Sequence, residues 1–149
     1  MSKKDESASD LVVSAVKILD PRGYIEGLLE SARDNFRALL ILLAYRGYGR
    51  VRATCGRRSL DSQMRLYGQG RGQGECLAAG VPAIYARPRL PVVTWCRPED
   101  SKHVRGLALD VDFSMYRGVT WWTVGKAAEA CGLTWGGTWK VKDYGHFEI

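Results

Sequence analysis

Ser101-Lys-His103-Val-Arg-Gly106-Leu-Ala-Leu-Asp110-Val-Asp112 combines a strand pattern with side chains that can bind a metal. Apolar residues recur at every second position from 107 to 113, which predicts a strand with one buried face. Asp110 and Asp112 share the opposite face with Ala108. The last residues, 146–149, repeat the pattern, with His146 and Glu148 on one face. These two strands are the expected centre of a small sheet.

The chain has only two histidines, and each lies in a segment with carboxylates nearby. If the two strands pair, His103, His146 and a carboxylate meet. Two histidines and one carboxylate provide the three ligands of a zinc site with an open fourth position. The residues alone leave either Asp110 or Asp112 as that ligand, and an arginine could partner the carboxylate instead of a metal. Asp143, three residues before His146, is placed to handle a proton from water at the metal.

Other periodicities outline the rest of the fold. Apolar residues at helical spacing predict a helix over 24–45. Further expected elements are a strand over 50–55, a short helix after Ser59, a long loop over 71–100 with a short strand near 92–93, a helix over 121–131, and a strand over 133–135. The order favours an α+β fold: a small antiparallel sheet carries the site, and helices pack on one side.

Composition fits one soluble domain. The chain has 149 residues, of which 46% are hydrophobic and 26% are charged. We expect residues 1–20 to be a poorly ordered lead-in and residues 21–149 to form a single domain. The longest aliphatic run, Ala38 to Ala44, is too short to span a bilayer, so membrane insertion is not expected. The first residues do not resemble a secretory signal, which predicts a cytoplasmic location.

The four cysteines, at positions 55, 76, 96 and 131, form no C-x-x-C pair, so a structural zinc knuckle is not expected. Reduced thiols are the default for a chain without an export signal. Cys55 and Cys131 fall at apolar positions, where we expect small core residues.

Positive charge is concentrated in the middle of the chain. The net charge is +6, and residues 46–105 hold twelve Lys and Arg against four Asp and Glu, a local net of +8. This basic block is either a solvated surface or a surface that attracts a polyanion. That polyanion could be a nucleic acid, but an anionic cell-wall polymer would fit the charge equally well, and a nucleic-acid-binding protein would not need the two histidines.

Several blocks of the sequence resemble the M15 zinc peptidases, which include D-Ala-D-Ala carboxypeptidases of the VanY type and phage endolysins that cleave L-alanyl-D-glutamate bonds. The matching blocks are Gly56-Arg57-Arg58-Ser59-x-x-x-Gln63-x-x-Leu66-Tyr67-x-Gln69-Gly70-Arg71, Thr94, Ser101-x-His103-x-x-Gly106-x-Ala108-x-Asp110, Trp135-Gly136-Gly137-x-Trp139 and Asp143-x-x-His146-Phe147-Glu148. The order and spacing are specific over roughly residues 36–149. Residues 72–93 depart from the pattern as an insertion, and the first twenty residues match nothing.

The resemblance implies roles for individual residues. The Zn²⁺ ligands would be His103, Asp110 and His146, and Asp143 would be the catalytic acid and base. Arg58 would stabilise the oxyanion, with Arg57 as the neighbouring alternative. Gln63 and Ser101 would line the substrate site. The roles of Asp112, Glu148 and Arg105 stay open.

The fold that the resemblance implies is the one shared by D-Ala-D-Ala peptidases and the hedgehog signalling domain. The implied activity is zinc-dependent hydrolysis of the peptide stem of peptidoglycan, with the L-Ala–D-Glu bond favoured. The alternatives are a D-Ala-D-Ala carboxypeptidase and, from another class, a non-catalytic zinc-bearing module that binds the cell wall. We expect a monomer with no nucleic-acid partner. As an endolysin, it would wait in the cytoplasm until phage lysis releases it to the wall.

Overall fold

The computed structural model describes residues 7–115 and 118–149. The helices are α1 (Ala8–Leu19), α2 (Glu30–Tyr45), α3 (Leu60–Tyr67), α4 (Gln73–Ala78) and α5 (Trp121–Ala130). The strands are β1 (Arg52–Cys55), β2 (Ala108–Asp112), β3 (Thr134–Trp135) and β4 (His146–Glu148). Single turns of 3-10 helix are η1 (Ile25–Gly27), η2 (Ala83–Tyr85), η3 (Pro98–Asp100) and η4 (Gly136–Thr138).

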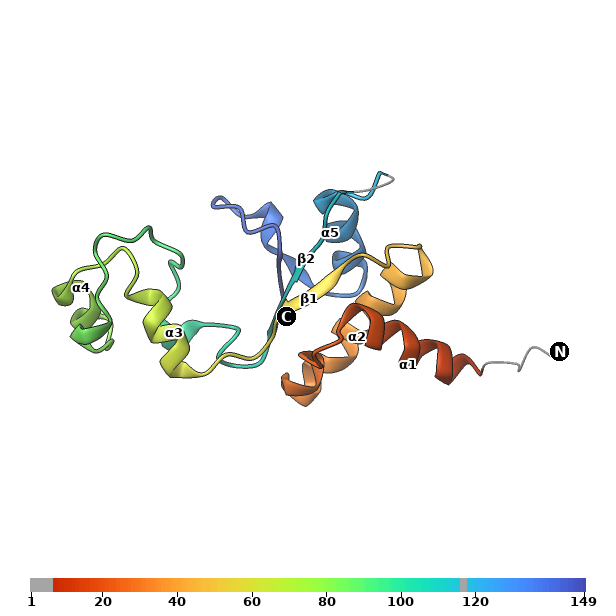
Figure 1. Cartoon of the computed structure of the whole chain (residues 1–149), viewed down its shortest axis with the longest axis horizontal. Helices are drawn as coiled ribbons and strands as arrows, with labels where there is room; N and C mark the ends of the chain where they lie inside the picture. Colours follow the sequence, from red (N-terminus) through yellow and green to blue (C-terminus); the bar gives the residue numbers. More distant parts are fainter. Residues whose placement is uncertain (1–6, 116–117) are drawn as a thin grey trace.

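The four strands form one antiparallel sheet in the order β1-β2-β4-β3. The two strands expected at the centre, β2 and β4, pair with Asp110 opposite His146. Helices α1, α2 and α5 lie on one side of these strands, while α3 and α4 extend away on the other (Figure 1). The expected α+β class is therefore confirmed.

The main core lies between the sheet and α2. Phe36, Leu39 and Leu43 of α2 are fully buried, as are Leu109 of β2 and Phe147 of β4. Each such side chain contributes about 1.5–3 kcal/mol by leaving water. Because side chains alternate along a strand, packing Leu109 and Phe147 into this core turns their neighbours to the opposite face. The core therefore decides which face of the sheet carries the site.

The helix expected over 24–45 is interrupted, and α2 begins only at Glu30. Asp20 starts the segment by accepting hydrogen bonds from the backbone nitrogens of Tyr24 and Ile25, at 2.8 and 2.9 Å. The backbone nitrogen of Leu29 then donates to the carbonyl of Gly106 at 2.9 Å. This contact uses an N–H group outside the helix, and it ties the loop that carries His103 to the start of α2.

We call residues 60–97 the arm. It has a small core of its own, formed by Cys76, Ala79 and Val81 with Met64, Tyr67, Tyr85 and Ala86 packed against it. The expectation of a long loop over 71–100, with a short strand near 92–93, is wrong in two respects. The chain forms α4, η2 and η3 there, and residues 92–93 form no strand. In Figure 1 the arm extends away from α1 and α2.

Part of the lead-in expected over residues 1–20 is helical. Residues 8–19 are helix α1, which begins with a capping box of Ser7 and Asp10 and ends at the buried Leu19. Residues 1–6 of that lead-in lie outside the described residues. None of the helices in the described part of the chain has the length and apolar content required to cross a membrane.

Candidate metal centre and active site

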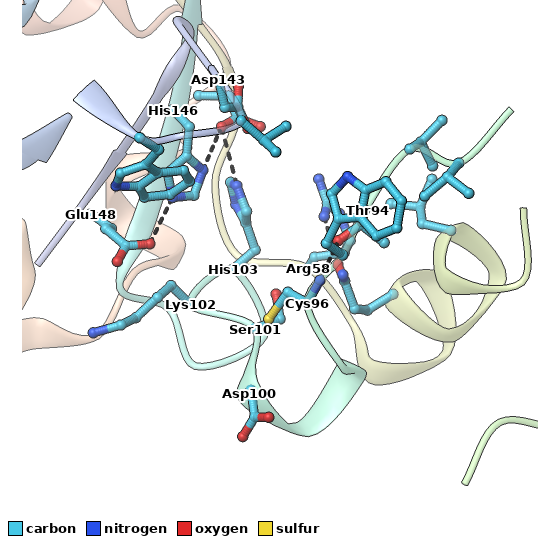
Figure 2. Close-up of a pocket in the computed structure, with 18 of the residues that line it drawn as sticks. Arg58, Thr94, Cys96, Asp100, Ser101, Lys102, His103, Asp143, His146 and Glu148 are labelled. Atoms are coloured by element: carbon cyan, nitrogen blue, oxygen red, sulfur yellow. Dashed lines mark hydrogen bonds and ion pairs between the residues drawn. The ribbon is translucent and has the colours of Figure 1, made fainter. Parts of the chain in front are cut away.

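Two imidazole side chains converge on one oxygen atom of a carboxylate. Asp110 on β2 and His146 on β4 are cross-strand neighbours, and His103 arrives from the turn before β2. The Nε2 atom of His103 lies 3.1 Å from Oδ1 of Asp110, and Nδ1 of His146 lies 3.2 Å from the same oxygen. Figure 2 shows the two histidines side by side. The structure thus brings together the three expected metal ligands.

The other nitrogen of each imidazole has a partner outside this cluster. Nδ1 of His103 lies 2.8 Å from the carbonyl oxygen of Gly56, and Nε2 of His146 lies 2.8 Å from Oε2 of Glu148. Both partners are acceptors, so in a metal-bound, neutral imidazole this outer nitrogen would carry the proton, and the nitrogen that faces Asp110 would be free to bind the metal. Metal-binding histidines have this arrangement, in which an outer acceptor fixes the tautomer.

The charges around Asp110 favour a cation. Burial raises the pKa of this carboxyl group, but hydrogen bonds from both histidines outweigh it and hold the pKa well below its usual range. Burial lowers the pKa of His103, yet the hydrogen bond to Asp110 and further contacts raise it to about 10. The pKa of His146 is also raised, by Asp110 and Glu148 against burial. A site that draws positive charge and offers two imidazoles and a carboxylate fits Zn²⁺.

A tight turn positions Asp143 beside this cluster. Its backbone nitrogen donates to the carbonyl oxygen of Gly136 at 3.1 Å. A Cβ atom at Gly136 would overlap the carbonyl oxygen of Asp143, so the turn requires glycine. Burial raises the pKa of the Asp143 carboxyl group. A raised pKa makes a carboxylate a better proton acceptor near neutral pH.

Arg58 reaches the site from the loop between β1 and α3, just before the arm. Its Nη1 atom donates to Oε1 of Gln63 at 2.6 Å, and its Nη2 atom donates to Sγ of Cys55 at 3.2 Å. The Arg58 backbone nitrogen also donates to the carbonyl of His103 at 3.0 Å. Gln63 is 2% exposed, so it holds the guanidinium from a fixed position. Arg57 is exposed and lies outside the cleft lining.

The remaining residues that the sequence singled out differ in whether they lie at the site. Ser101 is buried and lines the same cleft as Asp143. Asp112 is exposed, and its Oδ1 accepts a hydrogen bond from the Phe113 backbone at 2.8 Å, so it does not contact the histidines. Glu148, whose role the sequence left open, is the partner of His146 described above.

Cys55 is the residue of this site that sequence reasoning missed. The pairing of β1 with β2 shifts between Ala53 and Cys55, so that Cys55 lies opposite Asp110 instead of continuing the core face. Its Sγ atom lies 4.0 Å from Nδ1 of His103. The contact with His103 and the charge of Arg58 lower the pKa of this thiol. The expectation of a core residue is therefore wrong.

The Cys55 thiol also belongs to a possible metal-binding group. Ligand atoms of Cys55, His103 and Asp110 all lie within 4.8 Å of one another. The alternation in the sequence contained no sign of this arrangement, because only strand pairing reveals a bulge.

A cleft of about 920 Å³ contains the site. One wall comes from Arg58 and from the arm that follows it, with Gln63, Leu66 and the segment 92–96. The other wall comes from the sheet side and includes the segment 139–143 with His146 and Glu148. The ring of Trp139 lies against that of His146, with centroids 5.1 Å apart. Metal ligands and Arg58 therefore face one space from opposite sides.

Comparisons with known proteins find a family model that matches part of the chain and a structural neighbour. The chain is similar to the Serratia marcescens L-Ala D-Glu endopeptidase ChiX, with 22% sequence identity, coverage of 90% of this chain and 92% of that chain, and a TM-score of 0.45. No curated protein matches the chain. Residues 96–149 match the model of an M15 family described as D-alanyl-D-alanine carboxypeptidase. The matched residues contain both histidines, Asp110 and Asp143, so the similarity covers the expected metal ligands.

Proposed function

We propose that the protein is a zinc-dependent peptidase that hydrolyses the peptide stem of peptidoglycan, at the bond between L-Ala and D-Glu. The observation that carries this proposal is the convergence of His103 and His146 on one oxygen of Asp110, beside a cleft that Asp143 and Arg58 also line. A module that only binds the wall would have no need for a carboxylate and a guanidinium at that position.

The residues divide the chemistry as follows. Zn²⁺ held by His103, Asp110 and His146 would act as a Lewis acid and lower the pKa of water to about 7. Asp143 accepts a proton from the attacking water and later donates it to the leaving amine. Arg58 stabilises the negative charge that develops on the scissile carbonyl oxygen. Gln63 keeps the Arg58 guanidinium aimed into the cleft.

The size of the cleft supports an endopeptidase. About 920 Å³ lies at the upper end of the range of small-molecule sites, roughly 300–1,000 Å³, so the cleft has room for residues on both sides of a scissile bond. A D-Ala-D-Ala carboxypeptidase is the second candidate, because the matching family model has that description.

Analysis of the products tests the proposal. We expect purified protein incubated with peptidoglycan to produce new amino termini at D-Glu, identified by mass spectrometry. Release of free D-Ala alone would favour the carboxypeptidase. Intact stems after incubation with zinc present would contradict both candidates.

We expect the His103→Ala and His146→Ala variants to lose zinc, because each removes one of three ligands that converge on a single point. Metal analysis of the purified variants by mass spectrometry checks this. Full zinc occupancy in either variant would make the ligand assignment wrong.

The two aspartates of β2 provide a matched pair for the same measurement. Asp110→Asn should lower zinc occupancy, and Asp112→Asn should leave it unchanged, because Asp112 is exposed and does not contact the histidines. The opposite result would exchange the two roles.

We expect hydrolysis of intact sacculi to fall as salt rises past ~0.15 M, where the Debye length is about 8 Å, if the basic block attracts the enzyme to an anionic wall. Hydrolysis of a small soluble stem peptide should change far less. Arg87, Arg89 and Arg97 are exposed on the arm and outside the cleft lining. Replacing all three with Gln should weaken sacculus binding and leave peptide turnover nearly intact. Equal effects on both substrates would leave the block as a solvated surface.

A further inference from the structure

Trp95 is a large aromatic residue in an unusual position. It is 72% exposed, and it lines the same cleft as the metal-site residues. Apolar groups extend the wall beside it, from Leu66 and Val92 on the arm, and Val141 contributes from the facing wall. An exposed indole that lines a cleft offers a broad, rigid, apolar contact surface to a ligand.

Arg71 ties the segment that carries Trp95 to the end of α3. Its Nη1 atom donates to the carbonyl of Tyr67 at 2.6 Å, and its Nη2 atom donates to the carbonyl of Thr94 at 2.9 Å. Its guanidinium lies 3.9 Å above the ring of Tyr67 and 5.8 Å from the ring centre of Trp95. Both ring distances lie within the range of about 6 Å for cation–π attraction.

Arg71 is itself a buried cation, with 8% of its surface exposed. Among the described residues it makes no salt bridge with a carboxylate. Its charge is instead met by two carbonyl oxygens and two aromatic faces, which suits a planar guanidinium and not a lysine ammonium. The buried charge therefore serves to hold this wall of the cleft.

Gly70, next to Arg71, allows the chain to pack closely against the segment that carries Trp95. Gly70 has a φ of +77°, a conformation that favours glycine, and its nitrogen donates to the carbonyl of Arg87 at 2.9 Å. A Cβ atom at Gly70 would come within 2.7 Å of the Val92 nitrogen. The chain at Gly70 and Arg71 is thus packed directly against the segment 92–95.

We propose that Trp95 binds the aliphatic side chains of the peptide stem in the cleft and that Arg71 positions it. The inference rests on the proposed function, since the ligand is the substrate of that same site. Trp95 contacts substrate, whereas Arg71 acts through Trp95 and the Thr94 carbonyl. Neither residue takes part in the chemical step, so both should affect substrate binding more than turnover.

Steady-state kinetics of W95A, R71M, R71K and the W95A/R71M double variant test this proposal. The substrates are a free stem peptide and the same peptide attached to its disaccharide. W95A should raise KM about tenfold, the scale of one lost aromatic contact, on both substrates. Its kcat should stay within about twofold of the original value, because the lost contact stabilises the bound substrate and the transition state equally.

The Arg71 variants separate positioning from general stability. R71M should raise KM about as much as W95A does, and R71K less, since lysine keeps one donor but not the fork. The double variant should be no worse than W95A alone, because Arg71 acts through Trp95. R52M and W122A are matched controls: Arg52 is also a partly buried arginine that donates to two backbone carbonyls, Trp122 is also exposed, and neither lines the cleft. Both should keep the original KM.

Several outcomes would overturn the proposal. An unchanged KM in W95A would show that Trp95 does not contact the substrate. Because Trp95 is exposed, its replacement should leave folding intact. Additive effects in the double variant would remove the link between Arg71 and Trp95. An effect confined to the disaccharide substrate would assign Trp95 to the glycan. If the unmodified protein cleaves neither substrate, the proposed function fails as a whole, which is a distinguishable result.

Discussion

The Asp143→Ala variant is expected to fold, retain zinc and lose peptidoglycan hydrolysis by ~10²–10⁴-fold, the usual contribution of a general acid–base group. Asp143 lines the cleft, and burial raises the pKa of its carboxyl group. The proposed mechanism uses this carboxylate twice, to accept a proton from water and to donate it to the leaving amine. Rates of stem-peptide cleavage, measured with zinc content determined on the same samples, check the prediction.

Asp112→Ala is the matched control for that experiment. It also removes an exposed carboxylate from the sheet side of the molecule, but Asp112 lies outside the cleft lining, which includes Asp143. We expect it to retain near-normal hydrolysis. Near-normal turnover in Asp143→Ala would exclude the proton-transfer role, and zinc loss in that variant would make Asp143 a ligand instead.

The second large effect is expected for Arg58→Ala. Removing one group that stabilises an oxyanion costs about 10²–10³ in turnover. Arg58 is half-buried and fixed by Gln63, so its guanidinium is already oriented before substrate binds. The variant should therefore lower kcat more than it raises KM, and it should retain zinc. Separate measurement of kcat and KM on a soluble stem peptide checks this.

Arg57→Ala tests whether the effect belongs to the position or to charge in general. Arg57 carries the same charge next to Arg58 but is exposed and does not line the cleft. Its replacement should be much milder. A reversed ranking would move the role to Arg57, and a change in KM alone would make Arg58 a residue that binds the substrate in its ground state.

The central sheet and its expected metal ligands could be predicted because their signals are local. Alternation around Asp110 and His146 shows which face of each strand is polar, and the order of the blocks implies that the two strands pair. The choice between Asp110 and Asp112 needed the family resemblance, since both residues share a face. In the structure, it is the pairing of Asp110 with His146 that distinguishes them.

Other features depend on contacts between distant segments, which a local pattern does not contain. The bulge that turns Cys55 toward His103 exists only in the pairing of β1 with β2. The break before α2 depends on a hydrogen bond from Leu29 to Gly106, 77 residues later in the chain. Residues 71–100 were expected to be a loop because the helix α4 within them is short, and that helix is held by the small core around Cys76.

Titration of the metal-free protein with zinc tests the central proposal most directly. The protein is stripped with a chelator, and the release of new amino termini from peptidoglycan is followed as zinc is added back. We predict no hydrolysis without metal, a rise in proportion to the zinc that binds, and a plateau at one ion per chain. Full hydrolysis by the metal-free protein, or a plateau of activity unrelated to bound zinc, would contradict a zinc peptidase built on His103, Asp110 and His146.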